Sequence, residues 1–140
     1  MPSTEKPLRK QKGRSGGGSP EENFAADEEK RQKLKEQVSQ MQDRLMFLLD
    51  DWAPATYKYN YLQSRTGIPA SSWQNFFLGK QKATVEMLMA ISMQMPAEAQ
   101  WLMTGWPIKD ANGKSVLPPD GAFEKYLERR EWARAQKSGT

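Results

Sequence analysis

The residues best suited to chemistry lie in the second half of the run Leu62–Lys80. Small and carboxamide side chains share one face of a helix there, at Ala70, Ser71, Gln74 and Asn75. Short side chains let a helix approach base edges in a DNA groove, and a carboxamide can both donate to and accept from adenine. The pattern therefore favours hydrogen-bond readout of nucleic acid over the alternative, an ordinary solvated helix face.

The surrounding charge suits a phosphate ligand. No Asp or Glu occurs between Asp51 and Glu86, so nothing on this stretch repels an anion. The whole chain has 21 basic and 17 acidic residues, for a formal net charge of +4. Five of the basic residues lie within residues 1–14, and nine of the acids lie within residues 15–52. Such segregation is typical of a protein that binds a polyanion.

Two helices joined by a tight turn must position these side chains. We expect helices over residues 59–65 and 71–78, with a turn at Thr66–Pro69. Gly67 can adopt the left-handed backbone that ends a helix. The buried side chains are expected to be Leu62, Ile68, Trp73 and Phe76, which leaves Leu78 outside with the four residues above.

A long helix is predicted upstream of this pair. Ser19 is a suitable N-cap, Pro20 suits the first helical position, and nothing breaks the pattern before Pro54. The basic and glycine-rich residues 1–18 are expected to form a disordered arm, either inert or following DNA phosphates.

This helix carries an apolar stripe with a seven-residue period from Leu34 to Trp52. Upstream, the same register meets Arg31 and Asp27, so the stripe fails there. Its later part is expected to be the first core helix of a bundle, and the part Leu34–Met41 is a candidate for pairing with a second copy.

The segment after the motif predicts two more helices. Thr84 is expected to cap one of them, and Pro96 opens a short one that Gly105 closes. The first has many methionines, which are either core residues or a deformable partner surface. Its buried face is expected to consist of Val85, Leu88, Met89 and Met95.

The C-terminal residues change pattern. Asn112-Gly113 between two short β-capable pieces predicts a hairpin over residues 108–117, and Trp106 is expected to pack beneath it. A helix over 121–136 follows, with an apolar patch at Phe123, Tyr126 and Leu127.

Residues 42–105 carry several motifs at consistent spacing. They are the turn Gly67-Ile68, a buried Trp73, the pair Gly79-Lys80, a helix with Val85 and Leu88, and the closing Trp101-Leu102-Met103-Thr104-Gly105. In these motifs the chain resembles the Cro/phage-repressor-type helix-turn-helix proteins, often called the XRE family. It departs from that family at Gln63, where a small residue is usual, and at Tyr59 or Asn60, where Gln is frequent.

The resemblance implies roles for individual residues. It implies that Ala70, Ser71, Gln74 and Asn75 face the bases, and that backbone phosphates are contacted by Tyr59, Ser72, Lys80, Gln81 and Lys82. Contacts of the second kind position a protein on DNA without reading its sequence.

Composition excludes several other kinds of chemistry. The 140 residues include no Cys and no His, so disulfides, thiolate metal sites and the usual zinc ligands and serine-hydrolase base are missing. No apolar run approaches the ~20 residues of a membrane span, and the basic N-terminus lacks the apolar stretch of a signal peptide. We therefore expect a cytoplasmic protein with no catalytic activity, metal or cofactor.

Together these features predict an all-α fold: a five-helix repressor-like helix-turn-helix bundle with a long N-terminal helix, followed by a short β-hairpin and a helix. The expected boundaries are 1–18 for the arm and linker, 19–106 for the DNA-binding domain, and 107–140 for the hairpin and helix, a possible dimerisation element. The expected function is that of a sequence-specific regulator of transcription on double-stranded DNA, a bacterial or phage repressor acting as a homodimer. The alternatives are an antitoxin of the same fold, which also binds a toxin protein, and a helical adaptor that does not bind DNA.

Overall fold

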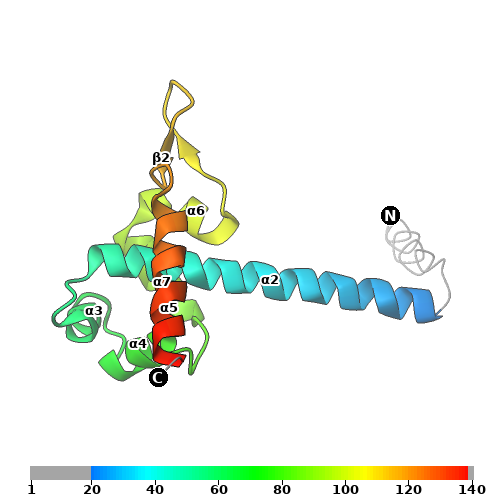
Figure 1. Cartoon of the computed structure of the whole chain (residues 1–140), viewed down its shortest axis with the longest axis horizontal. Coiled ribbons are helices and arrows are strands. Elements are labelled where there is room, and N and C mark those ends of the chain that lie inside the picture. The colour runs from blue at the N-terminus through cyan, green and yellow to red at the C-terminus, as the bar shows by residue number, and fades with distance from the viewer. Residues whose placement is uncertain (1–19, 139–140) are drawn as a thin grey trace, which may run out of the picture. The chain divides into compact units, whose positions relative to one another are not determined.

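The structure is a computed structural model that describes residues 20–138 (Figure 1). These residues are mostly helical, with one small antiparallel sheet. The elements are α2 (Pro20–Trp52), α3 (Lys58–Thr66), α4 (Ala70–Phe77), α5 (Val85–Gln94), the 3₁₀ helix η2 (Pro96–Glu98), α6 (Ala99–Thr104), β1 (Ile108–Lys109), β2 (Ser115–Leu117) and α7 (Ala122–Ser138). The predicted basic arm and the predicted cap Ser19 lie outside the described residues.

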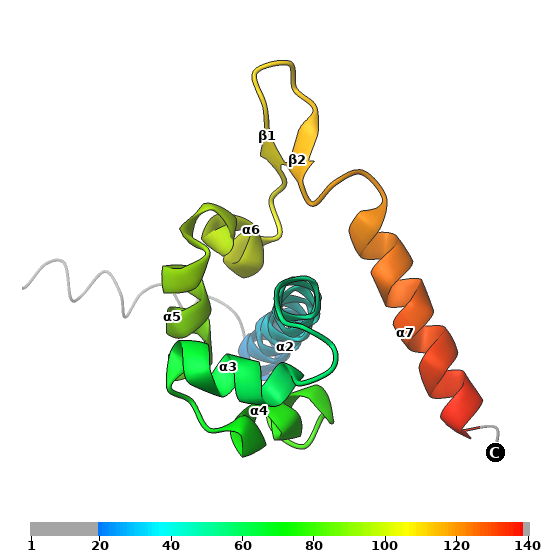
Figure 2. The same cartoon turned by 90° about the vertical axis from the view of Figure 1, so that its left-hand side faces the viewer.

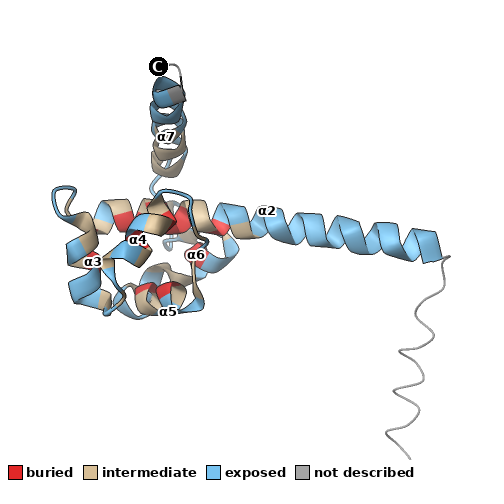
Figure 3. Ribbon diagram, turned by 90° about the horizontal axis from the view of Figure 1, so that it is seen from below, coloured by how far each residue is buried: buried red, intermediate tan, exposed pale blue. Residues whose placement is uncertain are grey.

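The chain divides into two compact units, residues 1–37 and 38–140. Helix α2 begins at Pro20 and ends at Trp52, as the proline punctuation predicts. Every residue from 20 to 37 is exposed, whereas the second half of the helix carries many buried side chains (Figure 3). The prediction that the later part of the stripe enters a core is confirmed, and Leu34 is exposed as expected. However, Met41 is buried in the core and Val38 packs against it half-buried, so the expectation that the whole part Leu34–Met41 stays free for a second copy was wrong.

The core of the second unit lies between α2 and the shorter helices α3, α4, α5 and α6. Figure 2 looks along α2 and shows these helices around its C-terminal half, with α7 on the other side. The predicted residues Leu62, Trp73 and Phe76 are buried, and Ile68 packs against them half-buried. The remaining buried apolar residues are Met41, Leu45, Met46, Leu48, Leu49, Ala53, Met87, Ile91, Trp101 and Leu102.

Helix α5 buries a different face from the one that its sequence suggested. Thr84 caps it as expected, since its hydroxyl accepts from the Met87 backbone N–H at 3.1 Å. However, Met87 and Ile91 are the buried residues, whereas Val85 and Met89 are 76% and 59% exposed. The prediction for Val85 and Met89 was wrong because this helix is apolar on most of its surface, so periodicity alone could not select the inner face.

Arg44 is a buried charged residue among these apolar side chains, and nothing in the sequence predicted it. Its Nε donates to the Leu102 carbonyl at 2.8 Å. Gly105, which ends α6 with a left-handed backbone (φ 79°), lies beside the guanidinium. A cation at the C-terminus of a helix satisfies its free carbonyls and opposes its dipole. Arg44 thus links the C-terminal half of α2 to the closing turn of the bundle.

The predicted hairpin forms, with Ile108 opposite Leu117. The Asp110 carboxylate accepts from the backbone N–H groups of Asn112 and Lys114, which shapes the turn. Ile108 and Leu117 pack on the core, but Trp106 is 67% exposed. The expectation that Trp106 packs beneath the hairpin was therefore wrong.

Helix α7 returns to α2 through its predicted apolar patch. The Phe123 ring packs edge-on against Phe47 and Trp101, with centroids 5.4 and 5.3 Å away. Farther along α7, Arg130 forms an ion pair of 2.6 Å with Asp43. The hairpin and α7 thus belong to the same compact unit as the bundle.

None of the helices within residues 20–138 is both long and apolar enough to cross a lipid bilayer.

Candidate nucleic-acid interface

A three-residue turn joins α3 to α4 and sets the direction of both helices. Gly67 has φ 80° and ends α3, with its backbone N–H donating to the Gln63 carbonyl at 2.8 Å. The Thr66 hydroxyl accepts from the Ile68 backbone N–H at 3.2 Å and from the indole of buried Trp73 at 3.3 Å. The Thr66 hydroxyl therefore connects the turn to Trp73, the buried residue that fixes α4 against the core. Because Trp73 points into the core, the opposite side of α4 is exposed.

Gln63 gives the start of α4 a defined partner. Its Oε1 accepts from the Ala70 backbone N–H at 2.7 Å, although Pro69, the N-cap residue, offers no side-chain oxygen. The amide thus satisfies one of the free N–H groups at the beginning of the helix. Gln63, which stands where XRE proteins usually have a small residue, therefore makes a structural contact between α3 and α4.

The outward face of α4 carries the side chains that could reach a ligand. Ser71, Gln74 and Leu78 are exposed, at the three- and four-residue spacing of one helix stripe. Ala70 and Asn75 flank this stripe and are half-buried. Of the four predicted base-facing residues, Ser71 and Gln74 are thus the most accessible.

The loop after α4 is held by backbone hydrogen bonds. The Asn75 carbonyl accepts from the N–H groups of Lys80 and Gln81 at 2.8 and 3.3 Å. Gly79 permits this reversal with φ 78°. Among the described residues neither Lys80 nor Lys82 has an ion-pair partner, and both are exposed. Two positive charges therefore stand at the C-terminal end of α4.

A cavity of about 530 Å³ lies behind this loop and adds a residue that sequence reasoning missed. Arg134 of α7 lines it together with Lys80 and Lys82, and Ser39 of α2 is also among its lining residues. Arg134 is exposed, and its contact with Glu131 is long, at 3.8 Å. The only signal in the sequence was the basic character of the C-terminal helix, which did not say where that helix packs.

A second hollow of about 450 Å³ lies at the other end, where the start of α3 meets α4. Tyr57, Asn60 and Gln74 line it, and the first turn of α3 contains no acidic residue and no side-chain cap. Uncapped N–H groups and the helix dipole favour an anion at such a terminus. Tyr59 also lines this hollow, but its ring packs against Phe77 with centroids 5.8 Å apart.

Not every cation near α4 is available to a ligand. Lys58 donates to the Asp50 carboxylate at 2.6 Å and lies 4.1 Å from the centroid of Phe77. The second oxygen of Asp50 accepts from the Tyr126 hydroxyl, also at 2.6 Å. Lys58 therefore has a structural role, and the positive charge at this surface comes from the loop and from α7.

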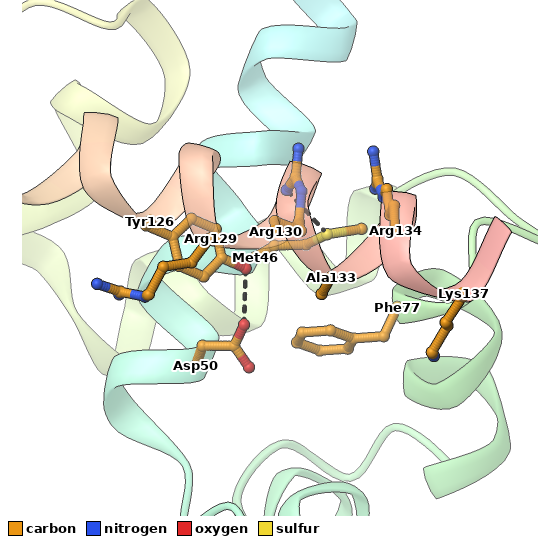
Figure 4. Close-up of a pocket in the computed structure, with 9 residues that line it drawn as sticks. All are labelled: Met46, Asp50, Phe77, Tyr126, Arg129, Arg130, Ala133, Arg134 and Lys137. Carbon is orange, nitrogen blue, oxygen red and sulfur yellow. Dashed lines mark hydrogen bonds between the residues drawn. The ribbon is translucent and has the colours of Figure 1, made fainter. Parts of the chain in front are cut away.

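The Asp50–Tyr126 bond borders a cavity of about 460 Å³ between α7 and the surface of α2 and α4 (Figure 4). Arg129, Arg130 and Lys137 are among its lining residues. Burial, followed by the hydrogen bond to Asp50, raises the pKa of the Tyr126 phenol above its ordinary value. The side chains of this cavity attach α7 to the bundle.

The predicted residues are thus brought together along α4 and at its two ends. Ser71 and Gln74 lie on the outward face with Ala70 and Asn75 at its edges, Ser72 is half-buried, and Lys80, Gln81 and Lys82 form the adjoining loop. Tyr59 lies at the opposite end, partly covered by Phe77.

Comparison with known proteins gave no match to any family model, to any curated protein or to any solved structure.

Proposed function

We propose that this protein is a sequence-specific regulator of transcription that binds double-stranded DNA, a bacterial or phage repressor of the Cro/phage-repressor type. The observation that carries the proposal is the outward face of α4, where Ser71, Gln74 and Leu78 are exposed and no acid occurs. Candidate phosphate-binding groups lie at both ends of this face. A helix with these properties has the size and chemistry of an element that enters the major groove.

Base readout falls to the exposed polar side chains. The Gln74 carboxamide suits the adenine edge, Ser71 can bond to several bases, and the apolar Leu78 suits a thymine methyl group. Asn75 contributes at the edge of the face. Its backbone carbonyl holds the Lys80–Gln81 turn, which couples the reading helix to the loop.

Phosphate contacts are proposed at both ends of α4. Lys80 and Lys82, together with Arg134 of the same cavity, contact the phosphates of one DNA strand. The uncapped N-terminus of α3 near Asn60 contacts the phosphates of the other strand. Gln81 and Tyr59 line the same two cavities, and together with Ser72 they complete the proposed backbone contacts. We propose that the protein acts in the cytoplasm without catalysis or cofactor.

A single recognition helix of this length reads about four to six base pairs, so useful specificity requires two copies on a symmetric site. We therefore propose a homodimer as the active form.

Selection of bound sites from random duplexes, followed by titration of the winning site in a salt series, tests the function. We expect one enriched motif and a linear fall of log affinity with log salt concentration. A chain that shifts no duplex at any salt concentration would contradict the proposal and favour the alternative, a helical adaptor that does not bind DNA.

A second candidate function is that of an antitoxin, which would bind a protein as well as DNA. It is favoured by the exposed apolar row Val85, Met89 and Met93 on α5, which is 59–76% accessible. Surface rows of this kind often mark protein interfaces, and methionine adapts to irregular partners. Stoichiometric co-purification of one small protein, abolished by Met89→Lys but not by Lys80→Ala, would favour this candidate.

A further inference from the structure

Within residues 20–37, the described part of the first unit, apolar side chains of α2 stand exposed. Phe24 and Leu34 are 64% and 60% exposed on a stretch of α2 where all of residues 20–37 are accessible. In the seven-residue register of the apolar stripe, Phe24 occupies the next seam position upstream of Asp27. Met41, farther downstream, is buried in the core of the other unit. The free seam therefore reads Phe24, Asp27, Arg31, Leu34.

This seam is complementary to itself when it is reversed. Phe24 and Leu34 are each five residues from Glu29, and Asp27 and Arg31 are each two residues from it. We propose that residues 20–37 pair with the same segment of a second copy in an antiparallel orientation. Phe24 then lies opposite the Leu34 of the other copy, and Asp27 opposite its Arg31, each pair occurring twice about a two-fold axis.

The charge distribution decides between the two possible orientations. Residues 21–29 contain five acids and no base, whereas residues 30–35 contain four bases and no acid. An antiparallel pair places the acidic half of each helix beside the basic half of the other. A parallel, in-register pair places Asp27 against Asp27 and Arg31 against Arg31 within the seam, where like charges repel.

Arg31 is already oriented within its own helix. It forms an exposed ion pair with Glu28, one turn away. A guanidinium has five N–H donors, so this contact leaves others for the Asp27 of a second copy. The short seam and the exposed ion pairs imply a salt-sensitive association.

Sedimentation of the full chain, without DNA and over a concentration series, tests the pairing. The charge reversals Asp27→Arg and Arg31→Asp should each weaken association about tenfold, because both ion pairs of the dimer become repulsive. An equimolar mixture of the two variants should associate again, since each then supplies the charge that the other lacks. Mixing does not change the stability of either helix, so this recovery reports on pairing.

Glu29→Arg is the matched control, since residue 29 lies outside the seam. It makes the same change of charge, and it also creates a like-charge pair four residues apart, with Lys33. It should leave association nearly unchanged. A wild-type chain that stays monomeric, or a dimer that loses no affinity with Asp27→Arg, overturns the proposal and directs attention to α5 or α7.

Disulfide trapping tests the orientation, because the chain has no cysteine of its own. A mixture of Phe24→Cys and Leu34→Cys chains should form the mixed disulfide. Phe24→Cys alone should not cross-link, because two residues 24 are ~15 Å apart along an antiparallel pair, beyond disulfide reach. A disulfide of Phe24→Cys with itself would refute the antiparallel arrangement.

The pairing does not rest on DNA binding. A chain that reads DNA but fails to associate would refute the pairing, and with it the homodimer as the active form, but not the recognition of DNA. A paired chain without DNA affinity would refute only the proposed recognition of DNA.

Discussion

Replacing Gln74 with Ala separates reading from folding. The Gln74 side chain is exposed and makes no hydrogen bond within residues 20–138. Ala is also the better helix former, so the free energy of unfolding should change by less than ~0.5 kcal/mol. Removal of a bidentate hydrogen bond to a base should cost ~1–3 kcal/mol of affinity for the selected site, which is roughly 5- to 150-fold. Binding to random duplexes should barely change, because phosphate contacts do not involve this side chain.

The measurement combines urea unfolding with titration against the selected duplex and a scrambled one. Gln100→Ala is the matched control, since Gln100 is also exposed but lies at α6, away from α4 (Figure 2). Trp73→Ala is the opposite case, with an expected loss of ~3–5 kcal/mol of stability, because Trp73 is completely buried. If Gln74→Ala binds the selected duplex as tightly as the parent, or unfolds at markedly lower urea, α4 is not the reading helix.

Three further predictions follow from the same geometry. Replacing Lys80, Lys82 or Arg134 with Ala should lower the salt slope of DNA binding by ~0.9 for each phosphate that is no longer neutralised; an unchanged slope in all three would remove the loop and α7 from the interface. Gly67→Ala should cost ~1–2 kcal/mol from backbone strain alone, since no atom lies within 4 Å of the added Cβ, and chemical denaturation measures it. Because the pKa of the Tyr126 phenol is raised in the folded protein, the unfolded chain loses the phenol proton at a lower pH than the folded chain does. Stability should therefore fall as the pH rises above ~10, by at most ~1.4 kcal/mol per pH unit, and the fall should be shallower in Tyr126→Phe.

Helix boundaries were predictable from the sequence because they depend on neighbours along the chain. Pro20 at the start of α2, Gly67 and Gly105 with left-handed backbones, and the Thr84 cap all act within one helical turn. The helical spacing of polar residues relative to buried Trp73 was likewise sufficient to predict most of the side chains on the outward face of α4. Of the four residues predicted on that face, Ser71 and Gln74 are exposed, whereas Ala70 and Asn75 are half-buried at its edges.

Tertiary packing decided the features that join distant segments. Arg44 meets the Leu102 carbonyl 58 residues away, and Arg134 of the last helix lines the same cavity as Lys80 and Lys82. It also placed Val85 outside, because α5 is apolar on most sides and only contact with the other helices selects its buried face. The sequence by itself determined which segments are helical and most of the side chains of α4 that face outward. Only the tertiary structure decided which other charges join that face, because no periodicity records where a distant helix packs.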